Sequence, residues 1–148
     1  MENWKTELDE HFKSKKQTRK ELKNKKEELK KSARRFIKKT ALPAFEELGK
    51  ELDRHRREIL IDKKKNWAAL MVRHNKKKEF VYEITLSTQA DHLLASRSVY
   101  SPNEKGKLKL GTEGKIRTAE NSARLDKIER ADIIADFLES YKQATRAR

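Results

Sequence analysis

The first forty residues contain neither glycine nor proline and consist largely of the strong helix formers lysine, glutamate, leucine, arginine and glutamine. The first proline, Pro43, is a natural stop for a helix. At about 1.5 Å per residue, a helix over this segment is roughly 60 Å long, which exceeds the diameter of the small domain that the remaining residues can build. The sequence therefore predicts an extended basic helical arm over residues 1–40 and an α+β domain over residues 41–148.

Positive charge is concentrated in this arm. Residues 1–40 hold fifteen lysine or arginine residues against seven acidic residues, so they carry +8 of the chain's formal net charge of +14. Such a balance favours polyanionic partners, namely nucleic acid, anionic lipid or an acidic protein. The same balance is also typical of a charged surface that contacts only solvent. Composition alone does not decide between a polyanionic partner and a solvated surface.

The sparse apolar residues of the arm follow a heptad frame. Its d positions are Leu8, Lys15, Leu22, Leu29 and Phe36, and its a positions are Phe12, Arg19, Lys26 and Ala33. A parallel homodimer would place Arg19 and Lys26 against their own copies, which is costly, whereas an antiparallel or heterologous pairing avoids that clash. The predicted oligomerisation residues, called the apolar seam below, are Leu8, Phe12, Leu22, Leu29 and Phe36.

A row of cations runs along one side of the same predicted helix at i+3, i+4 and i+7 spacing, interrupted by Glu27. Such a row can follow a phosphate backbone. Lysine triplets at 63–65 and 76–78 fall in consecutive turns, which places them at opposite ends of a meander. Few aromatic residues accompany the cations, so any binding is expected to be weakly sequence-specific. The predicted nucleic-acid-binding residues, called the basic stripe below, are Lys13, Lys16, Lys20, Lys23, Lys30, Arg34 and Lys38.

The rest of the chain changes from helical to alternating patterns and back. Pro43 suits the first turn of a second helix ending near Arg57. Strands are then expected over 58–62, 66–74, 79–87 and 93–100, and residues 107–110 could pair with 115–118 through a turn at 111–114. A closing helix is expected over about 130–145. The predicted fold class is α+β, with a long charged helix, a second helix, an antiparallel meander of four to six strands, and a C-terminal helix packed on the sheet.

Two of these strands indicate how the sheet is covered. In 79–87, Phe80, Tyr82, Ile84 and Leu86 are expected to face one way and the alternate residues the other. The segment 67–72 is apolar at every position, so both faces of this strand are apolar. It is therefore either a central strand covered on both faces or a strand whose second face is buried by the arm or by another subunit.

The segment Leu42-Pro43-Ala44-Phe45-Glu46-Glu47-Leu48, together with Leu52 and the stretch from His55 to Ile61, resembles a family of small uncharacterised bacterial proteins. In that family a charged N-terminal helix precedes a second helix and an antiparallel sheet. The resemblance implies this architecture for about half of the chain, and it implies no activity.

Catalytic and metal-binding patterns are weak in this sequence. There is no cysteine, and His11, His55, His74 and His92 lack the spacing of metal ligands, so no metal or cofactor is predicted. Gly106 and Gly111 have the spacing of a phosphate-binding loop but lack its Lys-Ser/Thr pair. Asp91 and the later triplet Glu113-Gly114-Lys115 match the residue types in the active site of a metal-dependent nuclease, where carboxylates hold Mg²⁺ and a lysine neutralises the scissile phosphate. Because such triplets arise freely in so charged a chain, an enzyme is not expected and no small-molecule ligand is predicted.

The sequence also predicts a location and a role. No apolar stretch approaches the roughly twenty residues that span a bilayer, and the N-terminus lacks the apolar core of a signal peptide. We therefore expect a small, non-enzymatic cytoplasmic protein that associates with itself or with a protein partner through the arm. The alternative is sequence-nonspecific nucleic-acid binding through the basic stripe.

Overall fold

A computed structural model describes residues 3–89, 92–118 and 122–146 of the chain. It confirms the predicted α+β architecture, with a long N-terminal helix, a five-stranded antiparallel sheet and a C-terminal helix. The elements in chain order are α1 (Asn3–Phe36), a π-helical turn (Ile37–Ala41), α2 (Leu42–Arg54), β1 (Glu58–Lys64), β2 (Trp67–His74), β3 (Lys77–Gln89), β4 (His92–Pro102), β5 (Leu108–Lys115), a 3₁₀ turn (Leu125–Lys127) and α3 (Arg130–Thr145).

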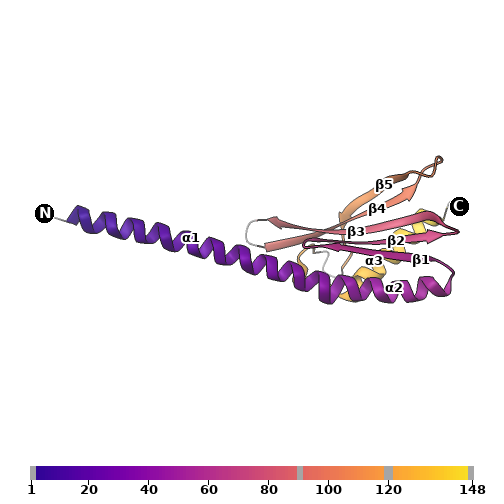
Figure 1. Cartoon of the computed structure of the whole chain (residues 1–148), viewed down its shortest axis with the longest axis horizontal. Coiled ribbons are helices and arrows are strands. Elements are labelled where there is room, and N and C mark those ends of the chain that lie inside the picture. Colours follow the sequence, from indigo (N-terminus) through magenta and orange to yellow (C-terminus); the bar gives the residue numbers. More distant parts are fainter. Residues whose placement is uncertain (1–2, 90–91, 119–121, 147–148) are drawn as a thin grey trace.

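The two N-terminal helices run on as one helix of 52 residues (Figure 1). Pro43 lacks a backbone N–H, and in a regular α-helix its ring would crowd the carbonyl of Lys39. The π-helical turn just before it absorbs this conflict, because the N–H of Leu42 bonds to the carbonyl of Ile37, five residues back. Pro43 therefore changes the hydrogen-bonding pattern but does not stop the helix. The prediction that the first helix ends before Pro43 is wrong.

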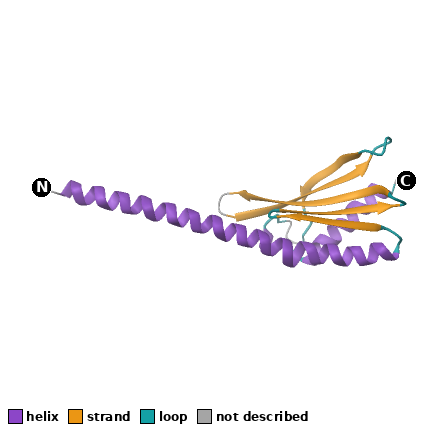
Figure 2. Ribbon diagram, in the orientation of Figure 1, coloured by secondary structure: helices purple, strands orange, loops and turns teal. Residues whose placement is uncertain are grey.

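The five strands follow one another in the sheet in chain order, and every neighbouring pair is antiparallel. The predicted alternation in β3 is confirmed, since Phe80, Tyr82, Ile84 and Leu86 are all buried. They face α2 and α3, which pack against the same side of the sheet (Figure 2). This arrangement places the core in a single layer between sheet and helices.

The core extends into the segment that the sequence assigns to the arm. Ala33, Phe36 and Ile37 are only 6%, 6% and 3% exposed and pack with the sheet. Further along the helix, Gly49 lies so close to β1 that an added Cβ would overlap the Cδ1 of Ile59. The long helix is therefore held by the domain from Leu29 onward. The remaining helical core residues are Ala41, Ala44, Phe45, Leu48, Leu52, Ile133 and Phe137.

The predicted hairpin between residues 107–110 and 115–118 is wrong. Residues Leu108–Lys115 form one strand, β5, which pairs along β4, and Gly111 and Gly114 lie within it. The turn comes earlier, where the Asn103 side chain accepts hydrogen bonds from the backbone N–H groups of Lys105 and Lys107. Gly106 adopts a φ of 80° there, a left-handed conformation that suits glycine.

The second face of β2 is not covered by the arm. The alternation of β2 directs Ala68, Leu70 and Val72 into the core, so Trp67 and Met71 lie on the opposite face and are half-buried. No helix packs on that face within the described residues (Figure 2). The ammonium group of Lys64 lies 5.6 Å from the centre of the Trp67 ring. Burial of this face by another subunit stays a prediction.

Candidate interaction surfaces

The N-terminal part of α1 projects from the domain as a free helix (Figure 1). Every residue from Asn3 to Glu28 is exposed, so this part, called the exposed arm below, extends for about 39 Å at the helical rise. An isolated helix of this length is only marginally stable in water, and most helices in proteins depend on packing of an apolar face. The exposed arm presents such a face without a partner from the described residues.

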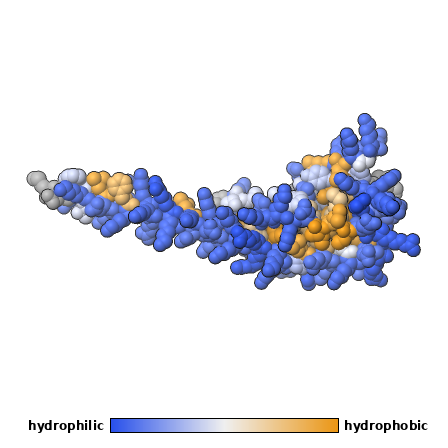
Figure 3. Space-filling model, viewed as in Figure 1, coloured by the Kyte–Doolittle hydropathy of each residue, from blue (hydrophilic) through white to orange (hydrophobic). Residues whose placement is uncertain are grey.

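The structure divides the apolar seam between the core and the solvent. Phe36 is buried and Leu29 packs at the edge of the core, whereas Leu8, Phe12 and Leu22 are 46%, 60% and 56% exposed. In the space-filling view, apolar side chains interrupt the hydrophilic surface of the exposed arm near its N-terminal end (Figure 3). Of the five predicted oligomerisation residues, Phe36 and Leu29 therefore pack with the domain, and Leu8, Phe12 and Leu22 are open to a partner.

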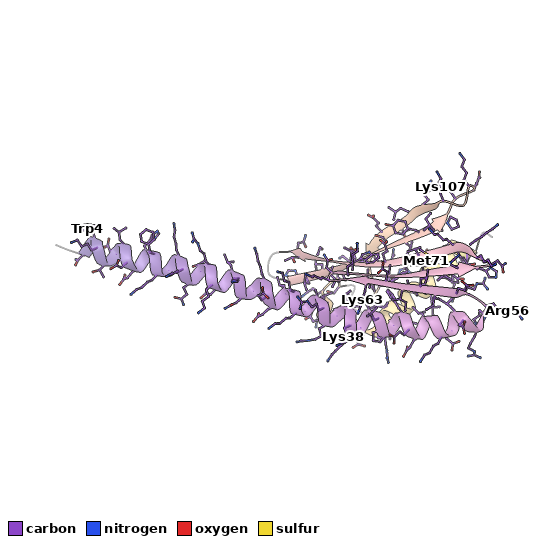
Figure 4. All side chains as sticks on the ribbon, in the orientation of Figure 1. Trp4, Lys38, Arg56, Lys63, Met71 and Lys107 are labelled. Atoms are coloured by element: carbon purple, nitrogen blue, oxygen red, sulfur yellow. The ribbon has the colours of Figure 1, made fainter. Side chains whose placement is uncertain are left out.

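Trp4 adds a fourth large side chain to the exposed part of the seam. It is 58% exposed and lies at the end of the arm most distant from the domain (Figure 4). Its position four residues before Leu8 places it on the same helical face. The heptad frame omitted Trp4, although the Trp4, Leu8 and Phe12 spacing of four residues would have included it.

The basic stripe is fully exposed. All seven of its cations are open to solvent, and none takes part in an ion pair with any residue in 3–89, 92–118 or 122–146. Helical geometry places the stripe beside the apolar seam, about a third of a turn away. A partner that covers the seam would therefore still leave much of the stripe accessible.

A groove of about 780 Å³ lies where the exposed arm meets the domain, and we call it the root groove. Its α1 side carries Lys26, Lys30 and Arg34, and Lys65 from the β1–β2 turn lies on the other side. The described residues that line it include no acidic side chain. Its apolar lining comprises Leu29, Ala33, Leu86 and Leu93. The fold thus joins part of the basic stripe to one of the two lysine triplets.

The other lysine triplet lies at the opposite end of the sheet, as the meander predicts. There a groove of about 910 Å³ is lined by residues of the β2–β3 and β4–β5 hairpins, among them Lys77, Lys78 and Lys105. Arg56 and Lys107 mark this end of the domain in Figure 4, far from the exposed arm. The two basic regions of the domain therefore do not combine into one surface on a single chain.

A half-buried cluster around Glu79 borders this second groove. Arg57 approaches both carboxylate oxygens of Glu79 at 3.4 Å, the Tyr141 hydroxyl donates a hydrogen bond to the same group, and His74 Nδ1 lies 3.8 Å away. Burial would raise the pKa of Glu79, but the hydrogen bonds from Tyr141 and Arg57 outweigh burial and lower it. Burial and the bond to Glu79 raise the pKa of Tyr141 to about 12. These contacts tie α3 to the sheet.

A second polar cluster lies inside the core. The carboxylate of Asp136 accepts a hydrogen bond of 2.7 Å from the Tyr82 hydroxyl and lies 2.9 Å from Arg97 Nε. Arg97 also donates to Thr112 at 3.0 Å. Burial, together with the charge of Asp136, raises the pKa of Tyr82 well above its usual value. Because Asp136 is 1% and Arg97 7% exposed, the cluster has a structural role in joining α3, β3 and β4.

The residues considered for catalysis are dispersed. Asp91 lies outside the described residues, and Glu113, Gly114 and Lys115 belong to strand β5 instead of the expected turn. Gly106 is in the β4–β5 turn while Gly111 is in the strand that follows, so the two do not form a phosphate-binding loop. Among the described residues, no three His, Cys, Asp or Glu side chains gather in a way that could hold a metal ion.

Two further findings bear on the character of the chain. Over the ranges that the structure describes, no helix combines the length and the apolar character needed to cross a membrane. Comparisons with protein-family models, with curated proteins and with solved structures found no match to this chain.

Proposed function

We propose that this chain is a non-enzymatic, self-associating protein and that the exposed arm forms the contact between copies. The observation that carries this proposal is the row of large apolar side chains, Trp4, Leu8, Phe12 and Leu22, which lie exposed on one face of a projecting helix. Aromatic residues of this kind are frequent energetic anchors of protein interfaces.

The energetics favour a helical partner for this face. Full burial of one large apolar side chain stabilises a complex by about 1.5–3 kcal/mol, before the cost of association is subtracted. The seam is too narrow and too often interrupted by cations to enter a bilayer as a continuous apolar face. A second helix, in contrast, can cover the apolar positions while the long lysine side chains extend to solvent.

Light scattering of the full-length chain and of a Leu8→Lys/Phe12→Lys variant tests this proposal. We expect the wild-type chain to form an oligomer and the variant to be monomeric, because the two substitutions place cations in the middle of the apolar face. A Gln17→Lys/Asn24→Lys variant is the matched control, since it adds the same charge to exposed positions on the opposite side of the helix. A wild-type chain that stays monomeric at high concentration would reject the proposal.

A second candidate function is sequence-nonspecific nucleic-acid binding through the basic stripe. Its support is the full exposure of all seven cations on one side of the arm. The affinity for duplex DNA would then fall steeply with salt, and charge reversal at Lys16, Lys20 and Lys23 would reduce the logarithmic salt slope by about three. Fluorescence anisotropy at several salt concentrations measures that slope, and salt-independent binding would argue against the stripe.

A further inference from the structure

The tip of the exposed arm differs in charge from the rest of it. Between Asn3 and Phe12, three acidic residues, Glu7, Asp9 and Glu10, accompany the cation of Lys5, whereas the arm beyond Phe12 is strongly basic. The same ten residues contain three large exposed apolar side chains of the arm. The tip is therefore an acidic amphipathic helix joined to a basic one.

The root groove has the complementary chemistry. Its rim carries Lys26, Lys30, Arg34 and Lys65 with no acidic residue among the described ones, and its lining includes apolar side chains. An acidic amphipathic helix is the kind of ligand that such a groove favours, because its carboxylates meet the rim while its apolar face covers the lining. The chain itself carries one such helix, at the far end of the same arm.

A single chain cannot bring its own tip to its own root groove, because one straight helix separates them. An antiparallel second copy can. When Phe12 of one arm lies opposite Leu22 of the other, helical geometry places Trp4 opposite position 30, between Leu29 and Ala33 at the root groove. Asp9, which borders the apolar face of the tip, then lies beside Lys23 and Lys30 of the other copy, whereas Glu7 and Glu10 lie further from the contact.

This alignment removes one like-charge contact of the seam and leaves another, because it places Lys26 opposite Leu8 but Arg19 opposite Lys15 of the other copy. In a parallel dimer Arg19 and Lys26 would each meet an identical residue, and the acidic tips would repel one another. The antiparallel arrangement places Lys26 opposite Leu8 and is symmetric, so that both copies form the same two tip-to-groove contacts. The groove side of each contact comes from α1 and from the strand ends that the fold brings beside it.

We propose that the root groove is the docking site for the acidic arm tip of a second copy of this chain, in an antiparallel dimer. The inference rests on the proposed self-association and adds its partner, its site and its orientation. It requires the tip and the groove to recognise one another by charge, which the following experiments examine separately from self-association itself.

Charge exchange between tip and groove is the first test, with the dimer dissociation constant measured by analytical ultracentrifugation of the full-length chain. Reversal of the tip (Glu7→Lys/Asp9→Lys/Glu10→Lys) or of the rim (Lys26→Glu/Lys30→Glu/Arg34→Glu) is expected to raise the dissociation constant about tenfold or more. Because all six positions are exposed, the fold is preserved. The variant that combines both reversals is expected to return to within about threefold of the wild type.

A matched control reverses three lysines at the opposite end of the sheet, Lys77, Lys78 and Lys105, and is expected to leave the dissociation constant unchanged. Self-association that persists but is insensitive to tip and rim reversal would overturn the docking and leave the proposed function intact. A monomeric wild-type chain would overturn both and leave the groove to an acidic segment of a different protein.

Cysteine cross-linking is the second test. Because the chain has no native cysteine, any disulfide must join the introduced cysteines. In the antiparallel dimer Asp9 of one copy flanks Lys23 of the other, so a mixture of Asp9→Cys and Lys23→Cys chains is expected to form a disulfide-linked dimer. Each variant alone is expected to remain unlinked, because the two copies of position 9 lie about 24 Å apart along the axis and the two copies of position 23 about 18 Å apart. Efficient linking of Asp9→Cys chains to one another would instead indicate a parallel dimer and overturn the inference.

Discussion

A chain that begins at Ala41 is expected not to fold, whereas a chain that begins at Lys25 is expected to keep the fold. The first truncation removes Phe36 and Ile37, which are 6% and 3% exposed in the core. Replacing a single buried Phe or Ile with alanine costs about 2–5 kcal/mol, and the whole stability of a domain is about 5–15 kcal/mol. The loss of both side chains and of the helical turn that holds them therefore removes most of that stability.

Circular dichroism and urea unfolding of the two truncated chains, beside the full-length chain, measure this difference. The chain that begins at Lys25 retains Leu29 and all of the buried helix residues, so we expect its free energy of unfolding to lie within about 1 kcal/mol of the full-length value. A cooperative transition at the same urea midpoint for the chain that begins at Ala41 would contradict the assignment of Phe36 and Ile37 to the core.

Helices and strands that pack one face in the core and leave a different environment on the other face were predictable from the sequence. The alternation of β3 follows from one face packed against helices, and the stripe of α3, with Ile133 and Phe137 buried, follows from one face packed against the sheet. The length of α1 follows from its helix-forming residues and the absence of glycine and proline. In each of these elements, local preference and tertiary packing favour the same structure.

Where local preference and packing disagreed, the sequence was misleading. Pro43 marks a helix end in isolation, but Phe36 and Phe45 on either side of it both pack into the core, and this favours a continuous helix with a π-helical turn. Gly111 and Gly114 indicate a turn in isolation, yet pairing with β4 keeps them extended within β5. Tertiary contacts determine both outcomes, and neither is encoded in the neighbouring residues.

The candidate surfaces show the same division. Heptad spacing predicted Leu8, Phe12 and Leu22 as interaction residues, and the structure shows that all three are exposed. It could not show that Leu29 and Phe36, which follow the same spacing, pack with the domain. The root groove was not predictable, because Lys65 and Leu93 are distant from the arm in sequence and reach it only through the course of the sheet.

Replacement of Asp136 by alanine is expected to destabilise the protein by about 3–5 kcal/mol, because it leaves a buried arginine without its counter-charge. Asp136 is 1% exposed and lies 2.9 Å from Arg97 Nε, a contact that is ionic and not a well-aligned hydrogen bond. The same carboxylate accepts hydrogen bonds from the Tyr82 hydroxyl at 2.7 Å and from the backbone N–H of Arg117 at 3.3 Å. The substitution removes the counter-charge of Arg97, the partner of the buried Tyr82 hydroxyl and the acceptor of the Arg117 N–H at the edge of the core.

Urea unfolding of Asp136→Ala measures this loss, and Asp126→Ala is its matched control. Asp126 forms an exposed ion pair of 3.6 Å with Arg124, so its removal is expected to cost less than about 1 kcal/mol. Because the penalty arises from the unpaired charge, an Arg97→Met/Asp136→Leu double variant is expected to be more stable than Asp136→Ala by about 2 kcal/mol. If Asp136→Ala unfolds at the same urea concentration as Asp126→Ala, the buried pair contributes no more than a surface one.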